Sequence, residues 1–123
     1  MRFARDQIDS GYTIQAYGQG QVTINDEVVT SSVVVTPARL LREWEPERFD
    51  DLAPAHLEAL AELEPEIVVL GTGGRLRFPA AAVTASLAAR GIGVEVMDTA
   101  AACRTYNILV SEDRNVVAAL LMI

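Results

Sequence analysis

The residues that could do chemistry are concentrated in the last third of the chain, between Gly91 and Ile123. This segment carries a string of polar side chains: Asp98, Thr99, Cys103, Arg104, Thr105, Tyr106, Asn107, Glu112, Asp113 and Arg114. The string offers one thiol and several carboxylates, but few groups that could activate them for catalysis. The segment therefore indicates a structure more clearly than it indicates a reaction.

Two side chains in this region could act in catalysis, and each also has a structural interpretation. Cys103 shares a helix face with Tyr106 and Val110, which predicts a buried and unreactive thiol. Glu95 lies within an otherwise apolar strand, where a buried carboxylate must be paired or neutralised. The available partners are Arg75, Arg77 and Arg114. We expect such pairing, and a role of Glu95 and Asp98 in proton transfer is the alternative.

The composition excludes several kinds of cofactor. All ten basic residues are arginine, and the absence of lysine excludes a pyridoxal phosphate Schiff base, a P-loop lysine and a Ser-Lys dyad. The single histidine, His56, and the single cysteine cannot form an ordinary zinc site. We therefore expect no metal and no cofactor. We favour a protein that is not an enzyme, without treating that question as closed.

Charge and hydropathy indicate which binding partners and which cellular location to expect. Seventeen acidic residues give a net charge of −7, which argues against a nucleic-acid-binding surface. The first six residues lack the apolar core of a signal peptide. The longest apolar run, Val116 to Ile123, is too short to span a bilayer. We expect a single cytoplasmic domain over residues 1–123, with no membrane insertion.

A glycine-rich turn, Gly71-Thr72-Gly73, follows an apolar strand. This pattern suggests a dinucleotide site, but the third glycine of G-x-G-x-x-G would fall at Leu76. The next helix also begins about six residues too late for that motif. Two interpretations remain: a tight turn that needs glycine, or a loop flanked by Arg75 and Arg77 that binds a small anion.

The pattern of apolar residues predicts an α/β fold. The first third alternates with a period of two, with turns at 18–20 and Asn25-Asp26 and an apolar strand at 32–35. Thr36-Pro37 has the features of a helix start, which predicts one or two helical turns over 38–44. Further helices are expected at about 54–63, 79–90 and 99–110, and strands at 66–70, 94–97 and 115–123. Strands that alternate with helices imply a mixed, largely parallel sheet with flanking helices, joined to an N-terminal β-hairpin region.

The helix that follows Asp98 has apolar residues on two sides. We expect the Asp98 carboxylate to accept a hydrogen bond from an N–H group of the first turn. Ala101 and Ile108 lie nearly opposite the packing face, beside Arg104. Such a helix is buried on two sides or covers a pocket or a partner. Arg104 and Asn107 are three residues apart and can point to one surface patch.

Five short motifs together resemble a known family. They are Gly71-Thr72-Gly73, Arg77-Phe78-Pro79, Gly91-Ile92, Met97-Asp98-Thr99 and Ala102-Cys103-Arg104-Thr105-Tyr106-Asn107. They are similar to a small domain-of-unknown-function family that includes mitochondrial NADH dehydrogenase (complex I) assembly factor 3 and an adipogenesis-associated protein. The resemblance covers essentially the whole chain, which looks like a bacterial member. It implies a three-layer α/β fold with a central mixed sheet and a β-hairpin layer, and a protein that works by binding other proteins.

These observations support two functional hypotheses. The first is a non-enzymatic protein-interaction or assembly factor with a protein partner of unknown identity, and self-association is left open. The alternative is a domain that binds a small ligand (an anion, a nucleotide or a lipid) in a crevice near Gly71–Gly73 and Asp98–Arg104. For either hypothesis the expected surface consists of Gly71, Thr72, Gly73, Asp98, Thr99, Arg104 and Asn107.

Overall fold

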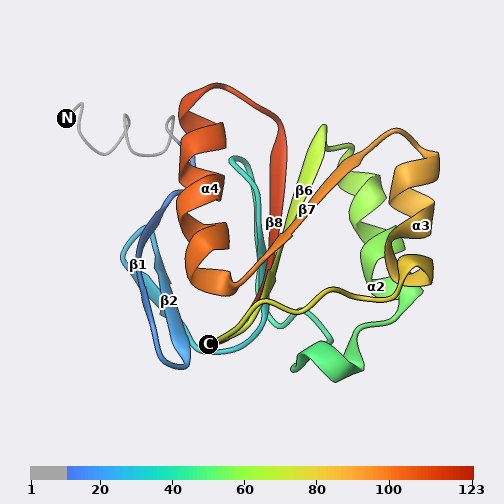
Figure 1. Cartoon of the computed structure of the whole chain (residues 1–123). Helices are drawn as coiled ribbons and strands as arrows, with labels where there is room; N and C mark the ends of the chain where they lie inside the picture. The colour runs from blue at the N-terminus through green and yellow to red at the C-terminus, as the bar shows by residue number, and fades with distance from the viewer. Residues whose placement is uncertain (1–10) are drawn as a thin grey trace.

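The computed structural model describes residues 11–123, which form three layers (Figure 1). The central layer is a five-stranded sheet of β4 (Val33–Val35), β5 (Leu40–Leu41), β6 (Ile67–Thr72), β7 (Gly93–Met97) and β8 (Val116–Leu121). One face is covered by α4 (Thr99–Ser111) and by a small sheet of β1 (Ile14–Gly18), β2 (Gln21–Ile24) and β3 (Glu27–Val29). The other face is covered by α2 (Pro54–Glu58), the 3-10 helix η2 (Ala59–Leu63) and α3 (Ala81–Ala89). The expected three-layer α/β fold is confirmed.

The central sheet is mixed, with the strand order β5-β4-β8-β6-β7. The middle strand of the parallel part, β6, pairs in parallel with both β7 and β8. The strands β4 and β5 extend the sheet in the antiparallel sense. The parallel part therefore brings the carboxyl ends of β6, β7 and β8 to one edge of the sheet, where α4 begins.

Each face of the central sheet has its own core, because successive side chains of a strand point to opposite faces. The core under α4 and the small sheet consists of Ile14, Val22, Ile24, Val29, Val33, Val35, Val69, Ala102, Cys103, Tyr106, Val116, Ala118 and Leu120. The core under α2, η2 and α3 consists of Val34, Leu57, Leu60, Ala61, Val68, Leu70, Leu87, Val117 and Ala119. A sheet covered on both faces needs strands that are apolar throughout, as β6 and β8 are.

The small N-terminal sheet forms as its sequence predicts. Its order is β1-β2-β3, and both pairings are antiparallel. Asn25 and Asp26 connect β2 to β3 with φ angles of 45° and 73°. Two positive φ angles define the tight hairpin turn that matches the twist of the strands.

The helical turns expected at 38–44 are wrong, because this segment contains strand β5. Val35 pairs with Leu40, and Val34 pairs with Leu41, so the chain reverses immediately after β4. The Thr36 hydroxyl accepts hydrogen bonds from the N–H groups of Ala38 (3.1 Å) and Arg39 (2.9 Å). A threonine hydroxyl can stabilise a turn through such bonds as well as a helix start.

The three later helices lie where they are expected. The helix at 54–63 begins as α2 and continues as the 3-10 helix η2, and the helix predicted from Pro79 begins at Ala81. Within residues 11–123, no helix has both the length and the apolar character needed to cross a membrane.

Candidate functional site

The glycine turn after β6 is packed tightly against the start of α4. A Cβ atom added at Gly71 would lie 2.8 Å from Thr99 Oγ1 and 3.1 Å from Leu120 Cδ2. Real Cβ atoms do not approach other atoms so closely, so this position requires glycine. Gly73 has a φ of 99°, a backbone conformation that residues with a Cβ rarely adopt.

Thr99 joins three elements through one hydroxyl group. Its Oγ1 accepts a hydrogen bond from Gly73 N–H (2.8 Å) and donates one to the Leu121 carbonyl oxygen (2.6 Å). The Thr99 N–H group also donates to the Gly73 carbonyl oxygen at 3.0 Å. The residue is fully buried, and its hydroxyl is used in holding β6, β8 and α4 together.

The two polar neighbours of this junction are also bonded within the protein. Asp98 Oδ1 accepts from Ala101 N–H at 2.8 Å, which confirms the predicted N-cap of α4. Thr72 Oγ1 donates to the Arg75 carbonyl oxygen at 2.7 Å and accepts from Arg77 N–H at 3.3 Å. These bonds fix the course of the chain as it leaves β6.

Farther along α4, Asn107 binds the edge of the small sheet. Its Oδ1 accepts from Ile14 N–H (2.9 Å), and its Nδ2 donates to the Ile14 carbonyl oxygen (2.6 Å). The Tyr106 hydroxyl donates to the Tyr12 carbonyl oxygen at 2.8 Å. The unpaired backbone groups of an edge strand are thereby satisfied by helix side chains. The Asn107 side chain therefore helps to hold α4 against β1.

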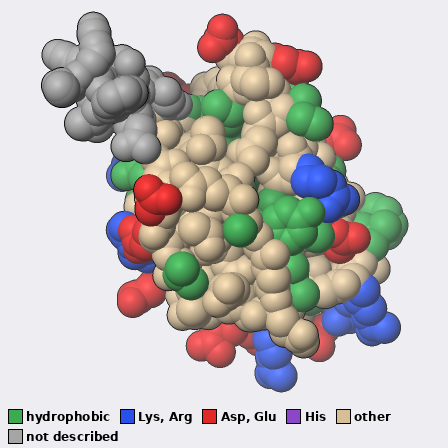
Figure 2. All heavy atoms as spheres, turned by 90° about the vertical axis from the view of Figure 1, so that its left-hand side faces the viewer, with side chains coloured by type: hydrophobic (Ala, Val, Ile, Leu, Met, Phe, Trp, Pro, Cys, Tyr) green, Lys and Arg blue, Asp and Glu red, His purple; other side chains and the backbone are tan. Residues whose placement is uncertain are grey.

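Arg104 differs from these residues because it lies on the surface. Its Nη1 donates to the Tyr17 hydroxyl at 2.6 Å, and its Cζ lies 5.9 Å from the centre of the Tyr17 ring. Ile108 lies one turn farther along the helix, with 57% of its surface exposed. We call Tyr17, Arg104 and Ile108 the α4 face. Figure 2 looks onto this side of the molecule, where hydrophobic side chains lie among polar ones and one such group touches basic side chains.

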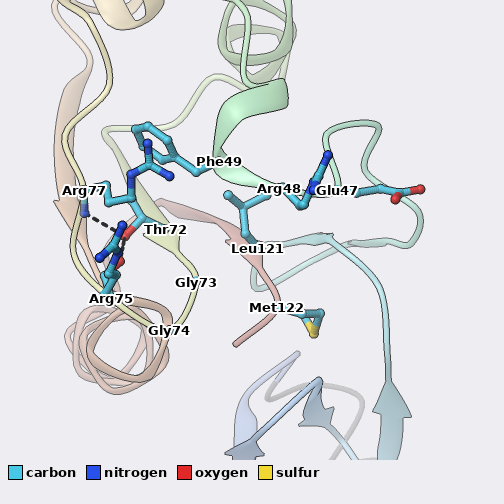
Figure 3. A pocket seen from close by; sticks show the side chains of 10 residues that line it. All are labelled: Glu47, Arg48, Phe49, Thr72, Gly73, Gly74, Arg75, Arg77, Leu121 and Met122. Carbon is cyan, nitrogen blue, oxygen red and sulfur yellow. Dashed lines mark hydrogen bonds between the residues drawn. The ribbon is translucent and has the colours of Figure 1, made fainter.

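A pocket of about 400 Å³ lies beside the glycine turn (Figure 3). It is lined by Glu47, Arg48, Phe49, Thr72, Gly73, Gly74, Arg75, Arg77, Leu121 and Met122. Asp98 and Arg104, which were expected at such a crevice, are not among these residues. Arg48 and Phe49 were missed, because the short 3-10 helix η1 (Phe49–Asp51) is distant in sequence from the glycine turn. The two adjacent acids in η1, which favour a helix start, were the available signal for that element.

The candidate catalytic groups are placed where they cannot readily react. Cys103 is buried, and burial raises the pKa of its thiol to about 12. Burial also raises the pKa of the Tyr106 hydroxyl. The expected burial of the thiol is therefore confirmed, and a raised pKa disfavours the reactive thiolate. Within residues 11–123, no cluster of three or more histidine, cysteine, aspartate or glutamate side chains could hold a metal ion.

The buried, paired state expected for Glu95 is wrong. Its strand, β7, is at the edge of the central sheet, and Glu95 is exposed. One side of this strand faces solvent at that point, so the carboxylate stays hydrated. Two of the three arginines expected as partners pair with other residues: Arg114 pairs with Glu66 at 2.8 Å, and Arg77 pairs with Asp50 at 3.1 Å. The Arg114 hydrogen bond lowers the pKa of Glu66.

The architecture defines a class, the small three-layer α/β domains with an N-terminal β layer. Residues 14–121 match the family described as "Protein of unknown function (DUF498/DUF598)", and the chain belongs to this family.

Three similar proteins illustrate the range of the family. The chain is 38% identical over 117 residues to NADH dehydrogenase [ubiquinone] 1 alpha subcomplex assembly factor 3 of Danio rerio, covering 94% of this chain and 67% of that protein. It is 28% identical to a 13 kDa major membrane protein of Francisella tularensis, covering 94% and 95%. A crystal structure of a Bordetella parapertussis protein superposes with a TM-score of 0.85 at 38% identity, covering 89% and 94%. The chain spans about two thirds of the length of the assembly factors.

Proposed function

We propose that the protein is a non-enzymatic interaction factor that binds a protein partner through the α4 face. The observation that carries this proposal is the contiguous, exposed arrangement of Tyr17, Arg104 and Ile108. Arg104 contacts Tyr17 directly, and Ile108 lies four residues from Arg104 on the same helix, within reach of its side chain. Tyr17 and Ile108 are 39% and 57% exposed, so both retain apolar surface that a partner could cover.

The chemistry of this face suits protein recognition. Tyrosine and arginine are the residue types most often found at the energetic centre of interfaces. Arg104 is held by the Tyr17 hydroxyl and ring, so less conformational freedom is lost when it binds a carboxylate or a carbonyl of the partner. An acidic or carbonyl-bearing edge beside a small apolar pocket for Ile108 is the complementary surface that we expect on the partner.

The burial and the hydrogen bonding of the potentially reactive side chains support a role without catalysis. The only thiol is buried with a raised pKa, and Asp98 is engaged at the start of α4. Glu95 is exposed on an edge strand, and in the part of the chain that the structure describes it forms no ion pair. A general acid or base needs a reacting partner within hydrogen-bond reach in an enclosed site, and none of these groups has that setting.

Family membership supports the same proposal. The family includes proteins named as assembly factors of NADH dehydrogenase, and such proteins act on other proteins. The proposal takes from them the binding of a protein partner. It does not take their particular client, because the chain matches only about two thirds of their length.

Affinity capture with matched charge variants tests the proposal. The wild-type protein, Arg104→Glu and Arg90→Glu would be used as baits under mild crosslinking, with the captured proteins quantified by mass spectrometry. Arg90 follows α3 and is exposed, so its reversal changes the net charge equally away from the α4 face. We expect one partner to be captured by wild type and Arg90→Glu and to fall at least tenfold with Arg104→Glu. Equal capture by all three baits, or no partner for any, contradicts the proposal.

A further inference from the structure

We propose that the pocket beside the glycine turn binds a phosphate group, either as the free ion or at the end of a small metabolite. We call it the arginine pocket and define its cationic part by Arg48, Arg75 and Arg77. It is formed by elements distant in sequence: the end of β6, the loop that follows it, η1 and the end of β8. Its volume of about 400 Å³ lies within the range of small-ligand sites, about 300–1,000 Å³.

The position of the pocket in the fold suits ligand binding. β6 and β8 are parallel neighbours, and their carboxyl ends, at Thr72 and Leu121, both line the pocket. In open α/β sheets, ligands bind in crevices outside the carboxyl ends of the strands. Here a crevice of this kind is present, and it is closed on one side by η1.

The charge of the pocket is opposite to that of the protein. The chain carries a net charge of −7, yet three of its ten arginines line this one pocket, with Glu47 as the single acidic lining residue. Figure 3 shows Arg75 and Arg77 on one side of Leu121 and Arg48 on the other, while the Glu47 side chain points away from this group. The clustered positive charge favours an anionic ligand.

The three guanidinium groups of the pocket differ in how they are paired. Within residues 11–123, neither Arg48 nor Arg75 forms an ion pair. Arg77 is held in place instead: its Nη2 lies 3.1 Å from Asp50 Oδ1, and its Cζ lies 4.1 Å from the centre of the Phe49 ring. The pocket therefore combines one oriented guanidinium group with two that can turn to the ligand. Guanidinium groups bind phosphate oxygens through paired hydrogen bonds, which makes phosphate a better match than a halide.

The remaining lining residues determine which group could be attached to the phosphate of a bound ligand. Gly74 is exposed and has no side chain, so a ligand can approach its backbone closely. Phe49, Leu121 and Met122 supply apolar surface beside the arginines. A phosphate monoester with a small apolar or planar group would use both parts, whereas the free ion would use the arginines alone. The pocket does not include Tyr17, Arg104 or Ile108, so this inference and the proposed partner surface can fail independently.

Nuclear magnetic resonance titration of the full chain tests this inference. Amide spectra would be recorded with inorganic phosphate, adenosine monophosphate and adenosine in turn. We expect phosphate and adenosine monophosphate to shift the amides of residues 73–77, and adenosine alone to leave them in place. Tighter binding of adenosine monophosphate assigns a metabolite, and equal or tighter binding of phosphate assigns the free ion.

Two serine variants separate the pocket from general charge effects. Arg75→Ser removes an exposed guanidinium group that forms no ion pair among the described residues, so the fold should persist. We expect it to weaken binding at least fivefold. Arg90→Ser removes the same charge away from the pocket and should leave binding unchanged. Absence of shifts at millimolar phosphate and adenosine monophosphate, equal shifts with adenosine, or equal weakening by the two variants would overturn the inference.

Discussion

Two sets of polar side chains on α4, Asp98 with Thr99 and Arg104 with its exposed neighbours, differ in what they bind. At the start of α4, Asp98 and Thr99 form hydrogen bonds within the protein. Asp98 caps the helix, and Thr99 bonds to the chain at the ends of β6 and β8. In the middle of the helix, Arg104 forms a hydrogen bond with Tyr17, its single side-chain partner within residues 11–123, and lies beside the exposed Ile108. Residue type alone therefore does not separate structural from functional positions on this helix. What separates them is the binding capacity that remains once the fold is complete.

The largest expected effect comes from the buried hydroxyl of Thr99. Thr99→Val keeps the shape but leaves Gly73 N–H and the Leu121 carbonyl oxygen without their partner. We expect a loss of about 2–6 kcal/mol in the free energy of unfolding, since each of the two unsatisfied buried groups costs about 1–3 kcal/mol. Thr105→Val, the same change on the same helix, is the control and should lose less than about 1 kcal/mol. Urea denaturation would measure the loss in each variant. Equal losses would show that the Thr99 hydroxyl does not hold β6, β8 and α4 together.

The next effect comes from the close contact at Gly71. In Gly71→Ala the new methyl group would lie 2.8 Å from Thr99 Oγ1, so either the threonine or the strand must move. Overpacking of this kind costs about 1–3 kcal/mol. Gly18→Ala is the matched control, because a Cβ at Gly18 would meet no atom within 4 Å. A midpoint of denaturation that is unchanged in Gly71→Ala would mean that the turn is looser than described.

A smaller loss is expected at the helix cap. Asp98→Ala removes the acceptor for Ala101 N–H, and loss of an N-cap costs about 0.5–2 kcal/mol. Asp98→Asn retains an acceptor and should recover most of that loss. The thermal midpoints of the two variants would give the comparison, and an asparagine variant as unstable as the alanine variant would point to the charge rather than to the cap.

The smallest effect on stability is expected on the α4 face. Ile108→Ser replaces an exposed side chain, and surface substitutions of this kind usually change stability by less than about 0.5 kcal/mol. The same variant should reduce partner capture strongly, because Ile108 provides the apolar part of the proposed contact. Measured together, a stable protein with reduced capture supports the comparison. A strongly destabilised protein would place Ile108 with Asp98 and Thr99, among the residues that hold the fold together.

The sequence predicts the layers of this fold better than it predicts the surroundings of individual side chains. Continuous apolar runs identify β6 and β8, and Asp98 identifies the start of α4, because these signals are local. Thr36 was misassigned because a hydroxyl before proline stabilises a turn as well as a helix start. Glu95 was misassigned because the sequence does not reveal that β7 is an edge strand.

The candidate sites show the same limit. Asn107 and Arg104 were expected to share one patch from their spacing, but the position of β1 leaves Asn107 bonded to Ile14 and Arg104 at the surface. The arginine pocket could be predicted only in part. Arg75 and Arg77 adjoin the glycine turn in sequence, whereas Arg48 reaches the pocket only through the tertiary fold.

Site-specific photocrosslinking in cells would show whether a partner binds at the α4 face. A photoreactive phenylalanine would replace Ile108 in one variant and Val28 in another. Val28 is 54% exposed and lies on the small sheet, so it is a matched apolar position away from α4. We expect a discrete crosslinked product from position 108 alone, and its loss when Arg104→Glu is added. A product from position 28 alone, or from neither position, would contradict the assignment of the α4 face as the partner surface.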